Sequence, residues 1–338
     1  MKAPAILSTL ALTTALSSAL VNKTSDDDFA PRVVGGQEAP IGQYTWTVGL
    51  RNSPSGSSGC GGSLISPTWV LTAGHCVNGG SRPSYVAVGT HYLQGASDGE
   101  QIPIKNIVSH PYYADPYQGN DVALIELSRP SKFTPIKLSK RVVAPGESVR
   151  LLGWGQTSGP QGSQSSVLKQ NDFSVVDNDE CARSVRASGQ QGLENWVAGP
   201  THLCAGGVYG QASCFGDSGG PLVRLNGDGS ASLVGDVSFG VPCGKGVPDE
   251  YGRISEFVDF IDRTARGHQW DDAVIPTTPT PRPVTPSPNT PTTPAPSPSD
   301  GGQCGTRHGV CFWPVTGQTV PFSEDQCKQF AGTFVWCP

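Results

Sequence analysis

The segment from residue 216 to residue 237 reads GDSGGPLVRLNGDGSASLVGDV, and its pattern indicates the class of the fold. Two short apolar runs, Leu222 to Leu225 and Leu233 to Val237, are separated by a cluster of Asn, Gly and Ser residues that favours a turn. Short runs bounded in this way are typical of β-strands, because a helix needs a longer amphipathic stretch to bury one face. This part of the chain therefore predicts β-structure.

The same pattern repeats from about Val33 to Ala265. Other short apolar runs between clusters of turn residues are Trp46 to Leu50, Ser63 to Ile65, Trp69 to Thr72, Val122 to Leu127 and Val149 to Leu152. Only the stretch from Ser255 to Ala265 has apolar residues at helical spacing, with Ser255 in the position of an N-cap. We therefore expect an all-β domain of sandwich or barrel type that ends in one helix.

Composition and charge exclude several classes of function. The chain has 338 residues and a net charge of −5, and it contains no dense run of Lys or Arg. A nucleic acid or an anionic membrane is usually bound through such a basic patch. We therefore expect no nucleic-acid partner and no membrane partner.

The N-terminus indicates export. Residues 1–19 combine Lys2, an apolar stretch from Ala5 to Leu16 and the small residues Ser17 to Ala19, which together are typical of a signal peptide. The stretch is too short and too rich in hydroxyl groups for a membrane anchor. We expect a secreted, extracellular protein whose ten cysteines form five disulfides, because that compartment is oxidising. The sequence has no CxxC or HExxH spacing, and we expect neither a metal nor a cofactor.

The composition changes after the β-rich part. Between Pro276 and Ser299, Pro, Thr and Ser make up 20 of 24 residues, so this stretch cannot bury a core and favours extended polyproline II. We assign residues 269–300 to a disordered linker and residues 301–338 to a small Cys-rich module. The four cysteines of this module allow two disulfides in three possible pairings.

The aromatic residues of the tail module have two interpretations. They are Phe312, Trp313, Phe322, Phe334 and Trp336. They either stack on sugar rings, which would tether the chain to a polysaccharide, or form the core of a module too small to fold on apolar burial alone. The sequence leaves both interpretations open.

Three segments carry residues suited to nucleophilic catalysis. They read LTAGHC at residues 71–76, NDVALI at 120–125 and GDSGGP at 216–221. In their order and in their amino-acid sequences, these segments resemble the His, Asp and Ser motifs of the chymotrypsin- and trypsin-like serine proteases. The resemblance covers residues 33–265. It implies two six-stranded antiparallel β-barrels with a C-terminal helix, and we assign residues 33–268 to this domain.

The resemblance also implies the role of each catalytic residue. Ser218 would be the nucleophile, His75 its general base, and Asp121 the residue that fixes the tautomer of His75. The N–H groups of Gly216 and Ser218 would form the oxyanion hole. Gly74 departs from the alanine that is more usual in the family before the histidine. The other histidines have no such setting, and we interpret them as structural: His91, His110, His202, His268 and His308.

The segment RVVGG at residues 32–36 resembles the activation site of the same family. Cleavage after Arg32 by an activating protease would release the amino group of Val33, which in the family pairs with the aspartate before the catalytic serine, here Asp217. Because a buried carboxylate without a partner is costly, this pair would form the active site only after cleavage. Residues 20–32 are therefore assigned as an activation propeptide.

The resemblance further implies how six of the cysteines pair. The implied disulfides are Cys60 with Cys76, Cys181 with Cys204, and Cys214 with Cys243.

The residues of the implied substrate pocket depart from the trypsin pattern. Ala212 occupies the base, where trypsins have aspartate, and Asp249 replaces a glycine of the opposite wall. Asp249 is either a wall carboxylate or an exposed loop acid. We expect broad or chymotrypsin-like specificity with secondary tolerance of Lys and Arg. The other implied substrate-binding residues are Phe215 at the rim and the segment Ser238, Phe239 and Gly240, whose backbone would hold the substrate as an added strand.

The sequence supports three hypotheses about function. The first is a serine endopeptidase that acts as a monomer on protein or peptide substrates, and the complete triad and activation site favour it. The second is a catalytically silent protease homologue that binds and inhibits another secreted protein. The third, a wall-binding adhesive protein, rests only on the tail module.

Overall fold

The computed structural model describes residues 34–80, 82–158, 162–271, 308–313, 318–320, 327 and 335–337. The predicted signal peptide, propeptide and Arg32–Val33 bond lie outside these residues, as does the Pro-rich stretch. Among the described residues, no helix is both long enough and apolar enough to cross a membrane.

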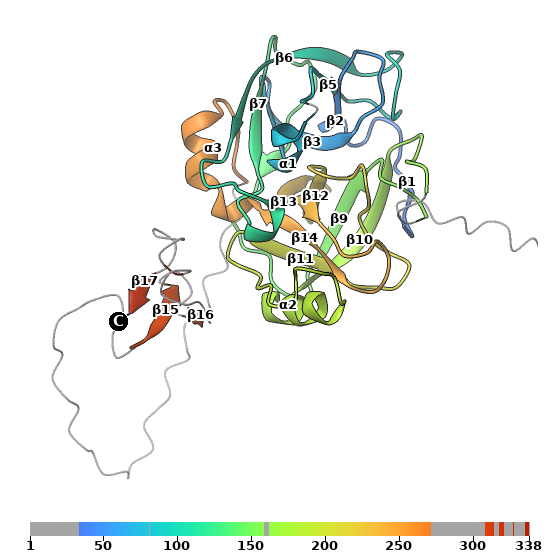
Figure 1. Ribbon diagram of the computed structural model, residues 1–338. Coiled ribbons are helices and arrows are strands. Elements are labelled where there is room, and N and C mark those ends of the chain that lie inside the picture. The colour runs from blue at the N-terminus through green and yellow to red at the C-terminus, as the bar shows by residue number, and fades with distance from the viewer. Residues whose placement is uncertain are drawn as a thin grey trace, which may run out of the picture.

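Six strands form a closed N-terminal barrel (Figure 1). Their order around the barrel is β2-β3-β4-β7-β6-β5, and every neighbouring pair is antiparallel. The strands are β2 (Thr47–Arg51), β3 (Cys60–Ser66), β4 (Trp69–Thr72), β5 (Tyr85–Val88), β6 (Glu100–Ser109) and β7 (Ala123–Leu127). Inside the barrel, buried Val and Leu residues of different strands pack together, including Val48, Val70 and Val86.

Six further strands close the C-terminal barrel, because β9 pairs with both β10 and β12. The ring is β9-β10-β11-β14-β13-β12, and all of its pairs are antiparallel. The strands are β9 (Ser148–Gly153), β10 (Lys169–Val176), β11 (His202–Gly206), β12 (Pro221–Leu225), β13 (Ala231–Phe239) and β14 (Pro248–Arg253). Two short strands, β1 (Gln37–Glu38) and β8 (Lys137–Leu138), attach to β10 and β13. The predicted pair of six-stranded antiparallel barrels is confirmed.

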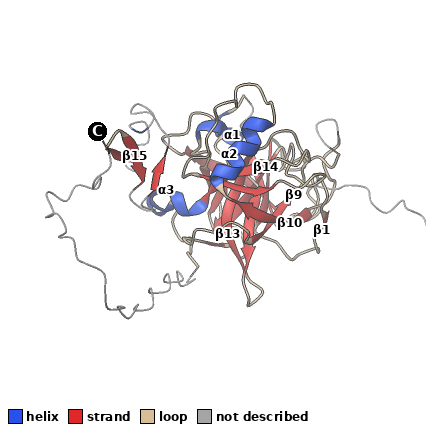
Figure 2. Ribbon diagram, turned by 90° about the horizontal axis from the view of Figure 1, so that it is seen from below, coloured by secondary structure: helices blue, strands red, loops and turns tan. Residues whose placement is uncertain are grey.

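Three α-helices and two 3₁₀ turns complete the described part of the domain (Figure 2). They are α1 (His75–Asn78), α2 (Asn178–Ala187), α3 (Val258–Thr264), η1 (Pro116–Gln118) and η2 (Ile254–Glu256). The predicted C-terminal helix is present as α3, but its N-cap is Phe257 and not Ser255. Ser255 lies inside η2, because the chain makes a tighter turn first and buries Phe257 before the α-helix begins.

Helix α3 packs against both barrels. Phe257 and Ile261 are almost fully buried in a cluster that includes Leu71 of β4 and Leu233 of β13. Burial of each such side chain contributes roughly 1.5–3 kcal/mol to the free energy of unfolding. The helix therefore helps to fix the two barrels relative to each other.

Residues 269–271 are attached to β8. The Leu138 N–H donates to the Gln269 carbonyl (2.9 Å), and the Asp271 N–H donates to the Leu138 carbonyl (2.7 Å). Arg224 of β12 forms an ion pair with Asp271 at 2.8 Å. Three residues of the range assigned to the linker are thus held against the C-terminal barrel.

The tail module contains a three-stranded antiparallel sheet in the order β16-β15-β17. Its strands are β15 (Val310–Trp313), β16 (Gln318–Val320) and β17 (Val335–Cys337). A disulfide joins Cys311 to Cys327, which selects one of the three possible pairings. Phe312 is buried, so this aromatic belongs to the core of the module.

Candidate active site

His75 and Asp121 lie together at one edge of the N-terminal barrel. His75 is the first residue of α1, just after β4, and Asp121 lies just before β7. The two strands pair at this end, where Thr72 is opposite Ala123. The His75 Nδ1 atom lies 2.7 Å from Asp121 Oδ2, and the His75 backbone N–H donates to Asp121 Oδ1 at 2.8 Å. Asp121 is buried, so both of its oxygens are engaged away from bulk water.

Gly74 has a local reason for lacking a side chain. A Cβ atom at this position would lie 3.0 Å from the Tyr113 ring and 3.2 Å from Asp121 Oδ1. The departure from the usual alanine therefore relieves crowding beside the Asp121 carboxylate.

The chain before Asp121 is held by a segment some eighty residues further on. Asn120 has a positive φ of 55°, and its N–H donates to Thr201 Oγ1 at 3.2 Å. The Trp196 indole N–H donates to the Tyr117 carbonyl at 2.9 Å. These contacts keep the turn before Asp121 in one conformation, which the strained backbone of Asn120 requires.

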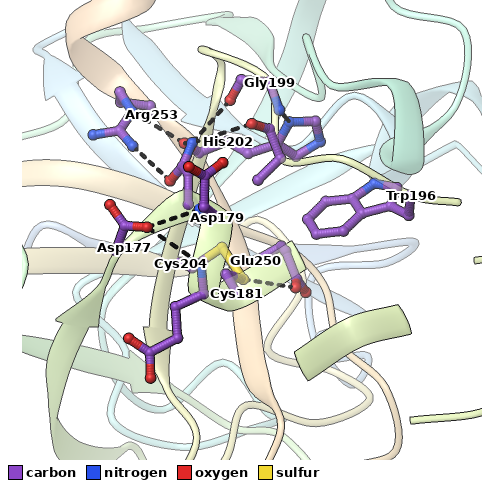
Figure 3. Close-up of a disulfide and its surroundings, with 12 residues drawn as sticks. Asp177, Asp179, Cys181, Trp196, Gly199, His202, Cys204, Glu250 and Arg253 are labelled. Atoms are coloured by element: carbon purple, nitrogen blue, oxygen red, sulfur yellow. Dashed lines mark hydrogen bonds between the residues drawn. A yellow bond between two sulfur atoms is a disulfide. The ribbon is translucent and has the colours of Figure 1, made fainter. Parts of the chain in front are cut away.

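The turn that carries Thr201 is itself built around the partly buried Arg253 (Figure 3). Arg253 Nε donates to the carbonyls of Pro200 and His202, each at 3.0 Å. The Gly199 N–H donates to His202 Nδ1 at 3.0 Å. Complete burial lowers the pKa of His202 to about 4, so the ring is neutral at pH 7 and can accept this hydrogen bond. His202 thus helps to hold this turn together.

Ser218 lies in the turn before β12, facing the N-terminal barrel. Gly216 and Gly219 have φ values of +100° and +73°, and a Cβ on Gly219 would lie 2.2 Å from Thr72 Oγ1. The Gly61 N–H donates to the Ser218 carbonyl at 2.7 Å, which fastens the turn to β3. The glycines thus allow a close approach of the two barrels at the serine.

The structure joins three of the site residues by hydrogen bonds and leaves Ser218 outside that network. Ser238 Oγ of β13 donates to Asp121 Oδ2 at 2.6 Å, so a residue of the second barrel also orients the aspartate. Among the described residues, no hydrogen bond joins Ser218 Oγ to His75. Cys76 Sγ contacts both residues, at 3.8 Å from His75 Nε2 and 3.5 Å from the Ser218 carbonyl oxygen.

Asp217 is fully buried beside the catalytic serine. Its Oδ1 accepts from the Gly155 N–H at 2.7 Å and its Oδ2 from the Cys214 N–H at 3.0 Å. A Cβ on either Gly153 or Gly155 would lie 2.0 Å from a carboxylate oxygen, so these glycines make room for the group. Burial raises the pKa of Asp217 to about 6, although the two N–H donors favour the charged form.

Val34 packs on the segment that leads to Asp217. Val34 is buried against Ala212 and the Cys214–Cys243 disulfide. Its carbonyl accepts from the Ala212 N–H at 3.1 Å. The residue after the predicted new N-terminus is therefore already docked on the segment that leads to Asp217.

Asp249 is a buried residue of β14 and not an exposed loop acid. Its Oδ2 accepts from the Ser213 N–H at 2.5 Å, and its Oδ1 lies 2.6 Å from the place of a Cβ on Gly240. Burial raises the pKa of Asp249 to about 7; the Ser213 hydrogen bonds oppose this rise, and the nearby charge of Asp217 adds to it. Ala212 is also buried and brings no charge.

The remaining implied substrate-binding residues differ in exposure. Phe215 is 62% exposed, whereas the Phe239 ring packs edge-on against Tyr117 (4.8 Å between centroids) and Trp196 (5.5 Å). The loop before Asp121 therefore touches the strand that the resemblance assigns to substrate binding.

The three implied disulfides of the domain are present, and they account for the groups that resemble metal sites. Cys60–Cys76, Cys181–Cys204 and Cys214–Cys243 have Cα separations of 6.2, 6.3 and 5.5 Å. In the described chain, the two clusters of potential metal ligands each contain both sulfurs of one disulfide, which are not thiolates.

Sequence reasoning missed two buried acids in the second barrel. Both Asp236 oxygens and Glu250 Oε2 are buried without a hydrogen-bond partner in the described structure. Burial raises the pKa of both groups well above their ordinary values. Glu250 Oε1 contacts Cys181 Sγ at 3.3 Å (Figure 3). Asp236 lies within the apolar run from Leu233 to Val237, whereas Glu250 lies in the polar sequence PDEYGR of β14, which does not indicate burial.

Two antiparallel barrels that bring a His–Asp pair and a glycine-flanked serine to their junction define the trypsin-like class of serine peptidases and their homologues. The Trypsin family profile matches residues 33–261. The chain belongs to this family.

Similar curated proteins carry a different functional name. Glucanase inhibitor protein 2 of Phytophthora sojae is 38% identical over 269 residues, which cover 77% of this chain and 89% of that protein. Glucanase inhibitor protein 1 of the same species is 41% identical, over 68% of this chain and 87% of that protein. Glucanase inhibitor protein 4 of Phytophthora infestans is 42% identical, over 65% and 85%.

Proposed function

We propose that the protein is a serine endopeptidase, made as a secreted precursor and activated by cleavage after Arg32. The observation that carries the proposal is the 2.7 Å contact between His75 Nδ1 and Asp121 Oδ2, with the same oxygen bound by Ser238. An acceptor on Nδ1 places the imidazole proton there, so that Nε2 is available as a base toward Ser218.

The proposed reaction has two halves. Ser218 Oγ attacks the peptide carbonyl carbon while His75 Nε2 takes its proton, and the negative oxygen is stabilised by the N–H groups of Gly216 and Ser218. His75 then donates the proton to the leaving amine, which leaves an acyl-enzyme on Ser218. Water, deprotonated by His75, hydrolyses that ester and restores the serine.

The second candidate is a protein that binds and inhibits another secreted protein. The names of the relatives support this candidate more directly than the first, since they describe inhibitors of glucanases. The missing hydrogen bond between Ser218 and His75 is also compatible with it. A common feature of both candidates is a protein partner.

One set of variants separates the two candidates. The protein cleaved after Arg32 is treated with a fluorophosphonate probe and, separately, added to a secreted glucanase. An endopeptidase is labelled and cleaves peptides, and Ser218→Ala abolishes labelling and lowers turnover by on the order of 10⁶. The matched control, Ser230→Ala in the exposed β12–β13 turn, changes neither.

A different outcome of the same experiment would favour the inhibitor function. If the cleaved protein is neither labelled nor able to cleave any peptide, and glucanase inhibition is the same with Ser218→Ala, then the inhibitor function replaces the endopeptidase proposal.

A further inference from the structure

His91 contacts both of the segments that the proposed activation would bring together. It lies after β5 in the N-terminal barrel, and only 5% of its side chain is exposed. Its ring contacts the segment that follows the predicted cleavage site, and its backbone contacts the segment that holds Asp217. One residue of the N-terminal barrel is therefore attached to both sides of the predicted ion pair.

The ring of His91 is bonded to Glu38 of β1. His91 Nε2 lies 2.9 Å from Glu38 Oε1, and because a carboxylate only accepts, the ring nitrogen is the donor. The Tyr92 ring packs edge-on against the imidazole, with 5.4 Å between the ring centroids. The His91 N–H donates to Asp98 Oδ2 at 2.6 Å, which holds the backbone that carries the ring. The imidazole therefore has a fixed position beside Glu38.

The chain between Val34 and Glu38 is otherwise attached to the C-terminal half of the domain. Strand β1 is two residues long and lies at the edge of its sheet, beside β10 (Figure 1). The Val34 carbonyl accepts from the Ala212 N–H at 3.1 Å and from Asn171 Nδ2 at 3.4 Å. The contact with His91 adds an attachment to the other barrel, at the far end of this segment.

The backbone of His91 is attached to the segment that holds the carboxylate. Its carbonyl accepts from the Trp154 indole N–H at 3.0 Å and from the Leu168 N–H at 2.7 Å. Gly155, the residue after Trp154, donates its N–H to Asp217 Oδ1 at 2.7 Å. The position of His91 is thus coupled to that of the Asp217 carboxylate through two consecutive residues.

We propose that His91 and Glu38 are positioning residues for activation: their contact holds residues 34–38 in place, so that the Val33 amino group released by cleavage stays at the Asp217 carboxylate. The inference rests on the proposed activation at Arg32 and adds a second point of attachment to it. When the contact is lost, the docked amino group competes with a larger set of released conformations. Loss of one hydrogen bond of this kind is expected to shift the equilibrium roughly fivefold toward the released form.

The experiment measures release of the amino group and needs no turnover. The Ser218→Ala protein is cleaved after Arg32 by an added protease and treated near neutral pH with cyanate, which carbamylates free α-amino groups. Mass spectrometry of the N-terminal peptide gives the rate of the reaction at Val33. A docked amino group reacts only from its released form, so the rate reports the fraction of protein in which the amino group is released.

Two variants remove the contact, one from each side. Glu38→Ala and His91→Phe should each raise the carbamylation rate at Val33 roughly fivefold. The double variant should react no faster than either single variant, because the two residues act through one contact. Glu38→Gln should restore part of the protection, because its amide oxygen can accept the same hydrogen bond. Glu38 is 49% exposed, so Glu38→Ala tests the contact even where His91→Phe does not fold.

Two further variants set the scale of the measurement. Asp217→Asn cannot form the ion pair and gives the rate of a fully released amino group. The matched control is Glu126→Ala, which breaks an ion pair of 2.7 Å with Lys105 elsewhere on the N-terminal barrel and should leave the rate at Val33 unchanged.

The possible outcomes separate the inference from the proposals on which it rests. A slow reaction in the parent that stays equally slow in Glu38→Ala and His91→Phe overturns the inference and leaves activation at Arg32 standing. An equal increase in Glu126→Ala also overturns it, because the effect would then be a general loss of stability. A parent rate equal to that of Asp217→Asn refutes both the ion pair and the inference. The expected rates, found together with no peptide cleavage by the protein that retains Ser218, uphold the positioning role and refute the endopeptidase function alone.

Discussion

Cleavage after Arg32 should stabilise the domain more at neutral pH than in acid. In the uncleaved chain the pKa of Asp217 is about 6, raised by burial from 3.8. A carboxyl group whose pKa is higher in the folded than in the unfolded chain makes its full contribution to stability below the unfolded pKa. As pH rises from the unfolded pKa through the folded pKa, this contribution to the free energy of unfolding is lost. At about 1.4 kcal/mol for each pH unit, ionisation of Asp217 lowers the free energy of unfolding by about 3 kcal/mol at pH 7 and by about 0.5 kcal/mol at pH 4.

The Val33 amino group, once released, would pair with the Asp217 carboxylate and so restore the free energy of unfolding that ionisation removes. Urea denaturation of the Ser218→Ala protein, before and after cleavage, should therefore show a gain of about 3 kcal/mol at pH 7 that falls to about 0.5 kcal/mol at pH 4. Asp217→Asn serves as the control, because an amide cannot form the ion pair and the gain should disappear. An equal gain at both pH values, or a gain that persists in Asp217→Asn, would refute the reasoning.

Four further predictions concern stability, catalysis, activation and the tail. Asp236→Val should raise the free energy of unfolding at pH 7, by on the order of 2 kcal/mol, because it removes an unpaired buried acid; a lower urea midpoint would contradict this. Thr201→Val removes the acceptor for the Asn120 N–H and should lower kcat by on the order of tenfold with little change in KM; unchanged peptide kinetics would show that the contact does not position Asp121. Arg32→Gln should leave the protein nearly inactive, and full activity of a chain shown by mass to be uncleaved would rule out the activation site. Truncation after Pro276 should spare hydrolysis of small peptides and abolish retention on cellulose, chitin or β-glucan, and equal retention of both forms would favour a purely structural role for the tail aromatics.

The architecture could be predicted because its signals are local. Short apolar runs with turn residues between them indicated strands, and three motif segments carried the barrel topology and the disulfides through family resemblance. The helix α2 was missed although it had a local signal: Asp177 caps its N-terminus, and Cys181, Ala182 and Val185 form its buried face. A window of only ten residues, mostly polar, made that face easy to overlook.

Other features of the site depend on contacts between distant parts of the chain. The hydrogen bond from Asn120 to Thr201 joins residues 81 positions apart, and no local pattern specifies it. The burial of Asp236 depends on Gly252 of the neighbouring strand, where a Cβ would lie 2.5 Å from the carboxylate. For Asp249 the sequence left open a wall carboxylate and an exposed loop acid; its burial in β14 excludes the second, and its role in a substrate pocket stays a prediction.

Because residues 269–271 are attached to β8, the two-barrel domain is structurally complete at Asp271 and does not depend on the residues after it. The last hydrogen bond to β8 is made by Asp271, and its ion pair with Arg224 closes the edge of the second barrel. A cut at any later bond removes no strand, helix or disulfide of either barrel. A protease acting on the Pro- and Thr-rich stretch would therefore separate an intact two-barrel domain from the small C-terminal module.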